Sequence, residues 1–146
     1  MKPEDLLVLS RDLARRETGK PKSVSLRRAV SGSYYALFHA LARLCADSLV
    51  GRKPWAIYTS VYRALDHRRA LAALAARGPS INAVAATFKT LQDVRHEADY
   101  SPEPFKPDRR DTMDLIDSAE RAVAMLDALT PDEKLALAIR PVVKPR

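Results

Sequence analysis

The sequence predicts an all-α protein, an antiparallel up-and-down bundle of four to five helices, from three observations. Alanine and leucine, which lose the least on entering a helix, dominate the apolar residues, whereas aromatics make up 6% of the chain and glycine occurs 4 times. Apolar residues recur at three- and four-residue intervals over long stretches, and no stretch reads clearly as a strand. The length of 146 residues corresponds to one domain with a core of its own.

The first two helices are expected over residues 4–18 and 23–50. In the first, leucines at helical spacing form one stripe, Pro3 suits the first turn, and Gly-Lys-Pro ends the helix. In the second, Ser23 or Ser25 can serve as the N-cap. Apolar and small residues cover most of the girth of this second helix, which predicts a central position with neighbours on several sides.

Three further helices are expected over residues 55–77, 80–99 and 108–129. The stretch Gly-Pro-Ser at residues 78–80 separates the first two of them, because glycine ends a helix, proline prevents its continuation and serine caps the next one. A proline-rich loop precedes the last helix, whose apolar residues again fall at helical spacing.

The whole chain is expected to form one packed unit with a short extension. The bundle is placed at residues 4–129, followed by a basic tail at residues 130–146 that adds one or two helical turns. Cys45 is the single cysteine, so no intramolecular disulfide can form. With no signal peptide and no apolar run long enough for a membrane span, the sequence predicts a cytoplasmic protein that has no contact with a membrane.

The chain is strongly basic, with a net charge of +7 and an isoelectric point of about 9.8. Such a charge favours polyanionic partners, including RNA, DNA and acidic proteins. The arginine and alanine bias of a GC-rich genome explains the same composition equally well, so the charge alone does not select a function.

Residues 91–104, "LQDVRHEADYSPEP", place an arginine on the apolar stripe of the fourth expected helix. Arg95 falls on that stripe, whereas His96 falls on the polar side and is expected to be solvated. A half-buried guanidinium needs a partner, and Asp99, four residues further on, can pair with it on the same face. Either this ion pair only pins the end of the helix, or it presents Arg95 to a phosphate group.

The second expected helix carries another polar group of residues. Tyr35 and His39 lie one turn apart among small residues, with Arg28 on the same side. A buried hydroxyl and a buried imidazole both need hydrogen-bond partners. Either His39 is a satisfied core histidine, or it joins Tyr35, Arg95 and Asp99 in one polar cluster between neighbouring helices.

Other chemistries find less support in the sequence. No HxxxH, ExxH or CxxC spacing for a metal occurs, and the glycines are too few and too scattered for a phosphate loop. Accordingly, neither a metal nor a cofactor is expected. His67, in "LDHRRA", lies on a charged helix face and is expected to be solvated, with neighbouring arginines that either touch nucleic acid or simply face water.

Two segments of the chain resemble the HEPN domain family. Residues 25–44, "SLRRAVSGSYYALFHALARL", resemble the signature helix of that family, in which a Tyr-Tyr-Ala-x-Phe-His run is common. Residues 94–102, "VRHEADYSP", resemble its Arg-x-x-Ala-Asp-Tyr segment, and one helix and a Gly-Pro break separate the two, as in the family. The resemblance covers residues 4–129.

This resemblance implies an antiparallel helical bundle that forms a homodimer. It also implies a toxin of a toxin–antitoxin pair, with a minimal nucleotidyltransferase as the antitoxin. Active members are metal-independent endoribonucleases in which an arginine is followed, after a gap of four to six residues, by a histidine. Arg95 matches the arginine, but Tyr100, Ser101 and Pro102 stand where that histidine is expected. Tyr100 can donate a proton or position a phosphate, and His39 can substitute if the fold brings it to Arg95.

Three hypotheses about function follow from these observations. The first is a HEPN toxin-type, RNA-acting protein resembling a metal-independent endoribonuclease. The second is a non-catalytic HEPN module that binds a nucleotide, RNA or a protein, and the third is a plain helical interaction domain. The first assigns catalytic roles to Arg95, Tyr100 and His39 and binding roles to Arg28, Tyr35 and Asp99.

Overall fold

The computed structural model describes residues 2–75 and 78–141, and all the regular structure in these ranges is helical. This confirms the prediction of an all-α helical bundle. Seven helices are present in the described part of the chain, which is more than the four or five expected. They are α1 (Pro3–Ala14), α2 (Ser23–Leu49), α3 (Trp55–Ala64), α4 (His67–Ala73), α5 (Pro79–Tyr100), α6 (Arg109–Asp127) and α7 (Pro131–Ile139).

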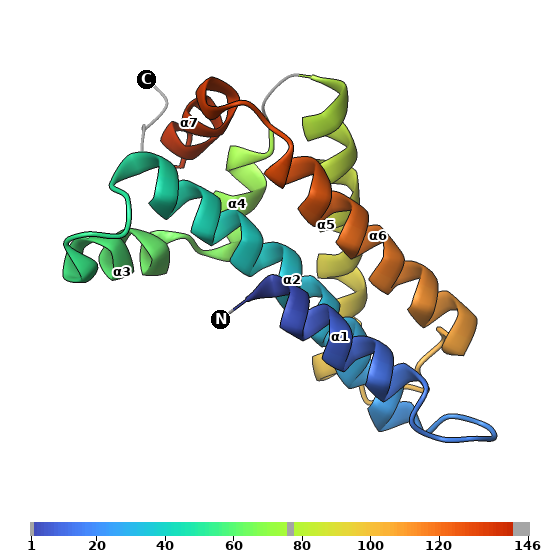
Figure 1. The fold of residues 1–146 in the computed structure, drawn as a ribbon. Helices are drawn as coiled ribbons and strands as arrows, with labels where there is room; N and C mark the ends of the chain where they lie inside the picture. Colours follow the sequence, from blue (N-terminus) through green and yellow to red (C-terminus); the bar gives the residue numbers. More distant parts are fainter. Residues whose placement is uncertain (1, 76–77, 142–146) are drawn as a thin grey trace.

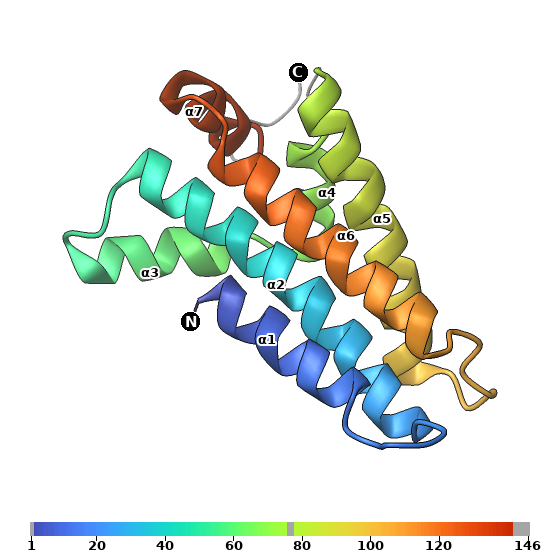
Figure 2. The same cartoon turned by 45° about the vertical axis from the view of Figure 1, so that its right-hand side comes forward.

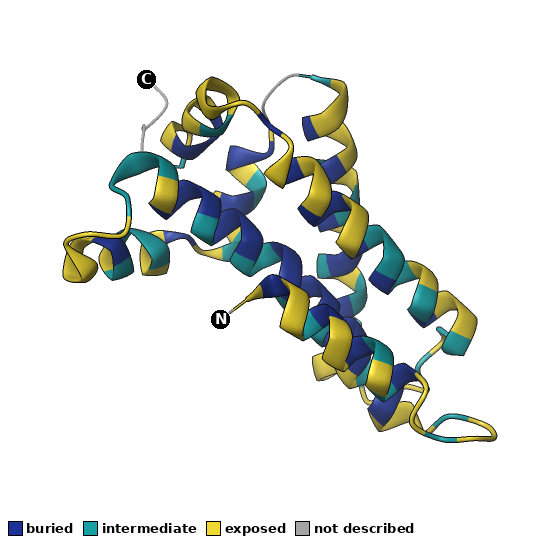
Figure 3. Ribbon diagram, viewed as in Figure 1, coloured by how far each residue is buried: buried dark blue, intermediate teal, exposed yellow. Residues whose placement is uncertain are grey.

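Helix α2 runs through the middle of the molecule, as its apolar girth predicted. It packs against each of the other six described helices, and Figures 1 and 2 show α1 antiparallel beside it. Along α2, buried residues occupy nearly every turn (Figure 3). The largest of its fully buried side chains are Tyr34, Leu37, Leu41 and Val30. Tyr34 therefore belongs to the core although it carries a hydroxyl group that needs a partner.

A glycine, Gly32, lies at the contact between α1 and α2. A Cβ atom built on Gly32 would lie 2.5 Å from Oγ of Ser10, a distance that real side chains do not adopt. Ser10 is itself buried, and its hydroxyl has no hydrogen-bond partner among the described residues. A side chain at this position would meet only the movable hydroxyl of Ser10, because the nearest backbone atom, the carbonyl oxygen of Leu6, would lie 3.8 Å away.

The third expected helix, over residues 55–77, is divided in two, so that prediction was wrong in its middle. Helix α3 ends at Ala64, and Leu65 is extended with φ −73° and ψ 121°. Asp66 then caps α4, since its Oδ1 accepts a hydrogen bond of 2.8 Å from the backbone N–H of Arg69. Because aspartate is among the best N-cap residues, the chain starts a new helix there, and His67 becomes its first residue.

The segment expected as a tail begins with a packed helix. Thr130 and Glu133 form a capping box at the start of α7. Leu137 and Ala138 are buried, and α7 packs on α2. The packed body therefore extends beyond the expected boundary at residue 129, while the last part of the expected tail, residues 142–146, lies outside the described residues.

Two arginines hold the loops at one end of the bundle in place. The guanidinium of Arg27 donates hydrogen bonds to carbonyls in the last turn of α5 and directly after it, including those of Ala98 at 3.0 Å and Ser101 at 2.9 Å. Arg109 donates to the carbonyls of Ala14 at 2.9 Å and Gly19 at 2.8 Å in the connection between α1 and α2. Both loops are therefore ordered although neither contains regular structure.

Candidate functional site

Arg95 of α5 is buried at the interface with α2, more deeply than the sequence indicated. The residue is 7% exposed, and its neighbours on the apolar stripe, including Leu91 and Ala98, are core residues. Its guanidinium carbon, Cζ, lies 4.9 Å from the ring centroid of Tyr34 and 5.8 Å from that of Tyr35. These contacts are cation–π interactions, which strengthen when the cation is removed from water.

The expected ion pair between Arg95 and Asp99 is present but long. Nη1 of Arg95 lies 3.6 Å from Oδ2 of Asp99, and the two side chains are 9% and 18% exposed. The same Oδ2 accepts a hydrogen bond of 3.4 Å from the hydroxyl of Ser31. Nε of Arg95 is buried and has no hydrogen-bond partner among the described residues. A guanidinium carries five N–H donors, so this one is under-satisfied for a buried charge.

A histidine reaches this cluster, but it is His67, which the sequence placed on a solvated face. That prediction was wrong: the Nδ1 atom of His67 is hydrogen-bonded to the hydroxyl of Tyr34. The imidazole also packs against Phe38, with ring centroids 5.0 Å apart. The cause is the break before α4, since the Asp66 cap turns the first residue of the new helix toward α2.

Burial and charge fix the protonation states of Tyr34 and His67, which share this hydrogen bond. Burial raises the pKa of Tyr34 far above its ordinary value, so its phenol keeps its proton. Burial also lowers the pKa of His67, and the nearby charge of Arg95 lowers it further, so the imidazole is neutral near pH 7. The Tyr34 hydroxyl has no other acceptor among the described residues, so it donates to Nδ1. The imidazole proton then lies on Nε2.

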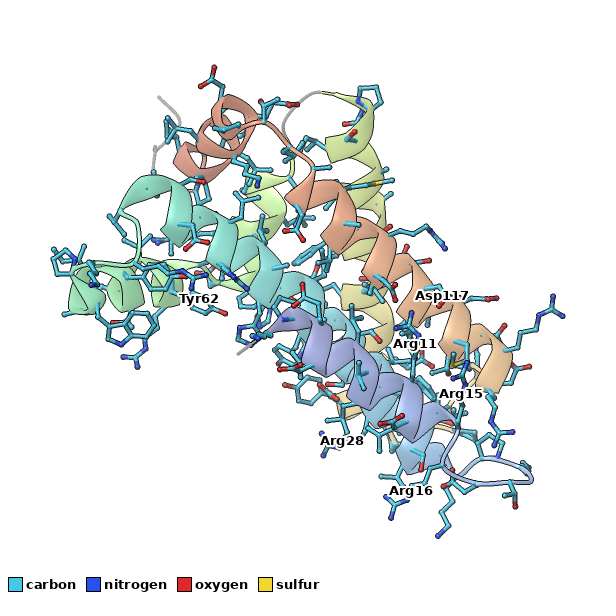
Figure 4. All side chains as sticks on the ribbon, viewed as in Figure 1. Arg11, Arg15, Arg16, Arg28, Tyr62 and Asp117 are labelled. Carbon is cyan, nitrogen blue, oxygen red and sulfur yellow. The ribbon has the colours of Figure 1, made fainter. Side chains whose placement is uncertain are left out.

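His39 does not join Arg95, contrary to the expectation of a shared polar cluster. Its Nδ1 is hydrogen-bonded at 2.5 Å to the hydroxyl of Tyr62 on α3, a residue that Figure 4 labels between α3 and α2. Burial lowers the pKa of His39. The alternative hypothesis for His39, a histidine satisfied within the fold, is therefore the one that the geometry supports.

The remaining expected residues line the open side of the Arg95 cluster. Tyr35 is half-buried beside the guanidinium. Tyr100 is 66% exposed, and its ring centroid lies 5.9 Å from Cζ of Arg95 and 5.1 Å from the ring of the exposed His96. Arg28 is exposed (Figure 4) and has no carboxylate partner in the described part of the chain. We call Arg95, Tyr34, Tyr35, His67, Asp99 and Tyr100 the Arg95 site.

The Arg95 site is suited to hold an anion. It offers guanidinium N–H groups and Nε2–H of His67, whereas its one carboxylate, Asp99, already accepts from Ser31. No group of three or more His, Cys, Asp and Glu side chains that could hold a metal ion occurs among the described residues. No described helix is both long enough and apolar enough to cross a bilayer.

Sequence reasoning missed Tyr34 and His67, the two residues that complete the site. Tyr34 stands in the quoted Tyr-Tyr pair, but its position on the main apolar stripe concealed its hydroxyl. The signal for His67 was Asp66, which is a preferred N-cap residue directly before it. Reading Asp66 as a cap would have moved His67 from the middle of a helix to the start of one.

No protein-family model, curated protein or solved structure matches this chain. The HEPN resemblance of residues 25–44 and 94–102 accordingly stays a hypothesis. The fold and the Arg95 site stand on the sequence and on the geometry described above.

Proposed function

We propose that this chain is a HEPN-like, RNA-acting protein whose Arg95 site binds a phosphate group of RNA. The observation that carries the proposal is the buried guanidinium of Arg95, which has a single carboxylate at 3.6 Å and an Nε without a partner in the described part of the chain. Removing such a charge from water costs several kcal/mol unless hydrogen bonds compensate. A phosphate supplies acceptors to the Nη groups of the guanidinium and suits the planar fork of arginine.

The surroundings of Arg95 support a bound anion rather than a fully satisfied core ion pair. Tyr34 holds the guanidinium from its buried side, and Tyr34 also fixes His67 so that its Nε2–H is free to donate. Tyr100 covers the exposed side without burying itself. Both donors are held by Tyr34, and donors held in place lose little freedom on binding.

The same geometry favours binding over cleavage. Metal-free cleavage of RNA needs a group that accepts the 2′-hydroxyl proton. Nδ1 of His67 is occupied by Tyr34, and His39 is paired with Tyr62. Cleavage is a second candidate function because His67 and Tyr100 both lie near Arg95. In that case Arg95 stabilises the phosphate, Tyr100 donates a proton to the leaving oxygen, and a water molecule accepts the proton of the 2′-hydroxyl.

The proposal includes two partners that the HEPN resemblance implies. One is a second copy of this chain, and the other is a minimal nucleotidyltransferase that acts as antitoxin. The exposed Tyr100 and the half-buried Tyr35 lie on the face that a second copy would have to cover for two Arg95 sites to meet. Light scattering across a range of concentrations tests the dimer, and co-purification with a nucleotidyltransferase encoded beside this chain tests the pair.

Binding and metal-free cleavage of RNA, measured on the same purified samples, test the proposed function. Arg95→Lys keeps the charge but removes the planar fork, so we expect it to lose most of the affinity, and Arg95→Gln to lose at least as much. Arg43→Gln is the matched control, since Arg43 also pairs with an aspartate four residues on, at 3.7 Å, but at an exposed position. Equal RNA binding by wild type, Arg95→Lys and Arg95→Gln, with the fold intact, would refute the Arg95 site.

A further inference from the structure

Unpaired cationic side chains gather where α1 connects to α2. Between residues 15 and 28 the chain carries one carboxylate, that of Glu17. Five of the cationic residues in this stretch are exposed. We call these five the basic end: Arg15, Arg16, Lys20, Lys22 and Arg28. Figure 4 shows Arg15, Arg16 and Arg28 around the lower ends of α1 and α2.

The basic end is not neutralised by neighbouring acids. None of its five residues has a carboxylate within 4.0 Å in the described part of the chain, whereas several cations elsewhere, such as Arg11 and Arg43, do. The carboxylate of Glu17 instead accepts a hydrogen bond of 2.7 Å from the hydroxyl of Ser25. Its negative charge is therefore engaged at the start of α2, and the cations remain available for an external anion.

The connection between α1 and α2, which carries most of these cations, is held in one conformation. Arg109 donates hydrogen bonds to the carbonyls of Ala14, Glu17 and Gly19, at 2.9, 2.6 and 2.8 Å. A loop fixed by three such bonds presents its side chains from defined positions. Less conformational freedom is then lost when a ligand binds.

The basic end continues toward the Arg95 site. Arg28 lies one helical turn before Ser31, whose hydroxyl reaches Asp99 at 3.4 Å. Arg27, the residue before Arg28, holds the carbonyls of Ala98 and Ser101. Arg28 is thus beside the last turn of α5, where Tyr100 is exposed.

We propose that the basic end binds the backbone of single-stranded RNA and leads it to the Arg95 site, an inference that rests on the proposed function. The cations contact successive phosphates, and a base stacks on Tyr100, whose ring lies 5.1 Å from that of His96. Single-stranded RNA is favoured over a duplex because only an unpaired base offers its face to an exposed ring.

Fluorescence anisotropy with an oligouridylate of about 12 nucleotides, a length within the range of single-strand binding sites, tests this inference. We expect Arg16→Glu/Lys20→Glu to weaken binding about tenfold at low salt. The salt slope, which is the slope of the logarithm of the binding constant against the logarithm of the salt concentration, should become shallower by about 1.4, because each phosphate contact on a single strand contributes about 0.7. Arg63→Glu/Arg121→Glu, with the same change in charge at exposed positions of α3 and α6, should leave the slope close to that of wild type. Tyr100→Ala should weaken binding without changing the slope.

The outcomes separate this inference from the proposed function. If Arg95→Gln abolishes binding but both charge-reversed pairs bind alike, the basic end has no specific role and this inference fails. If the basic-end pair alone weakens binding, the inference holds and the Arg95 site fails. Two results would overturn the choice of single-stranded RNA. One is equal affinity for a duplex of the same length. The other is binding of phosphatidylserine vesicles that depends on the basic end, without binding of RNA.

Discussion

The buried hydroxyl of Tyr34 is hydrogen-bonded to Nδ1 of His67, and this one bond joins the central helix to α4 beside Arg95. Three segments that are far apart in the sequence meet at this bond. Tyr34 belongs to α2, His67 follows the cap at Asp66, and Arg95 of α5 packs on the Tyr34 ring. The protonation and stability of the site depend on this contact.

The tautomer of His67 is the first expected outcome. Because Tyr34 donates to Nδ1, the neutral imidazole should carry its proton on Nε2. Long-range proton–nitrogen NMR spectra near pH 7 distinguish the two tautomers directly. Tyr34→Phe should remove the preference without removing the ring. An Nδ1–H tautomer in the wild type would show that the hydrogen bond runs the other way.

Stability should fall as the solution is made mildly acidic. Burial lowers the pKa of both His67 and His39 in the folded chain, so below about pH 6.5, the ordinary value, the unfolded chain binds protons that the folded chain resists. The two neutral histidines therefore contribute their full stability above the pKa of histidine in the unfolded chain. This contribution is lost as the pH falls toward the lower pKa values that His39 and His67 have in the folded chain. Urea unfolding at a series of pH values measures this, and His39→Gln/His67→Gln should flatten the curve. Stability that increases over this range on acidification would contradict the assignment.

Removal of the carboxylate partner of Arg95 should be costly. Asp99→Ala leaves a buried guanidinium without its ion pair, and we expect a loss of about 3 kcal/mol. The control is Asp47→Ala, which breaks the exposed pairs with Arg43 and Arg52 and should cost about 0–1 kcal/mol. Chemical denaturation measures both values. Equal effects for the two variants would mean that Arg95 is solvated.

The cap of α4 should control the position of His67. Asp66→Ala removes the acceptor of the Arg69 N–H, and we expect a loss of about 1 kcal/mol together with a change in the His67 resonances. Asp66→Asn keeps an acceptor at the same position and should retain both. If Asp66→Ala leaves the His67 signals unchanged, another contact sets the start of α4.

The approach of α1 to α2 gives a paired test of packing. Gly32→Ala should destabilise the chain by no more than about 1 kcal/mol, because the new Cβ meets only the movable Oγ of Ser10 and alanine is favoured over glycine inside a helix. Ser10→Ala removes a buried hydroxyl without a partner in the described residues and should be neutral or stabilising. Combining the two changes should recover part of the loss, and thermal melting can measure all three. A purely additive result would show that the two positions do not touch.

The bundle was predictable from the sequence because apolar periodicity records burial directly. The central place of α2 and the burial of Arg95 both followed from which residues share a helix face. The break at Leu65 and Asp66 did not, because apolar residues continue at helical spacing on both sides of it, so the pattern alone favours one long helix.

The partners of the site residues were less predictable than their burial. His39 and Tyr35 lie on one face of α2, but His39 is hydrogen-bonded to Tyr62, whereas Tyr35 packs beside Arg95. The angles at which two helices cross decide which of their side chains come into contact, and the spacing of residues along one helix carries no information about those angles. The hydrogen bonds of Arg27 and Arg109 to distant carbonyls depend on the completed fold in the same way.

The Nε–H signal of Arg95 in NMR spectra offers the most direct test of the central claim. In the free protein this buried group has no hydrogen-bond partner among the described residues. Titration with a short oligouridylate should move the Arg95 signal, and the change should be absent when the oligomer is replaced by uridine, which lacks a phosphate. A signal that stays in place while RNA binds elsewhere on the protein would contradict the assignment of Arg95 as the phosphate ligand.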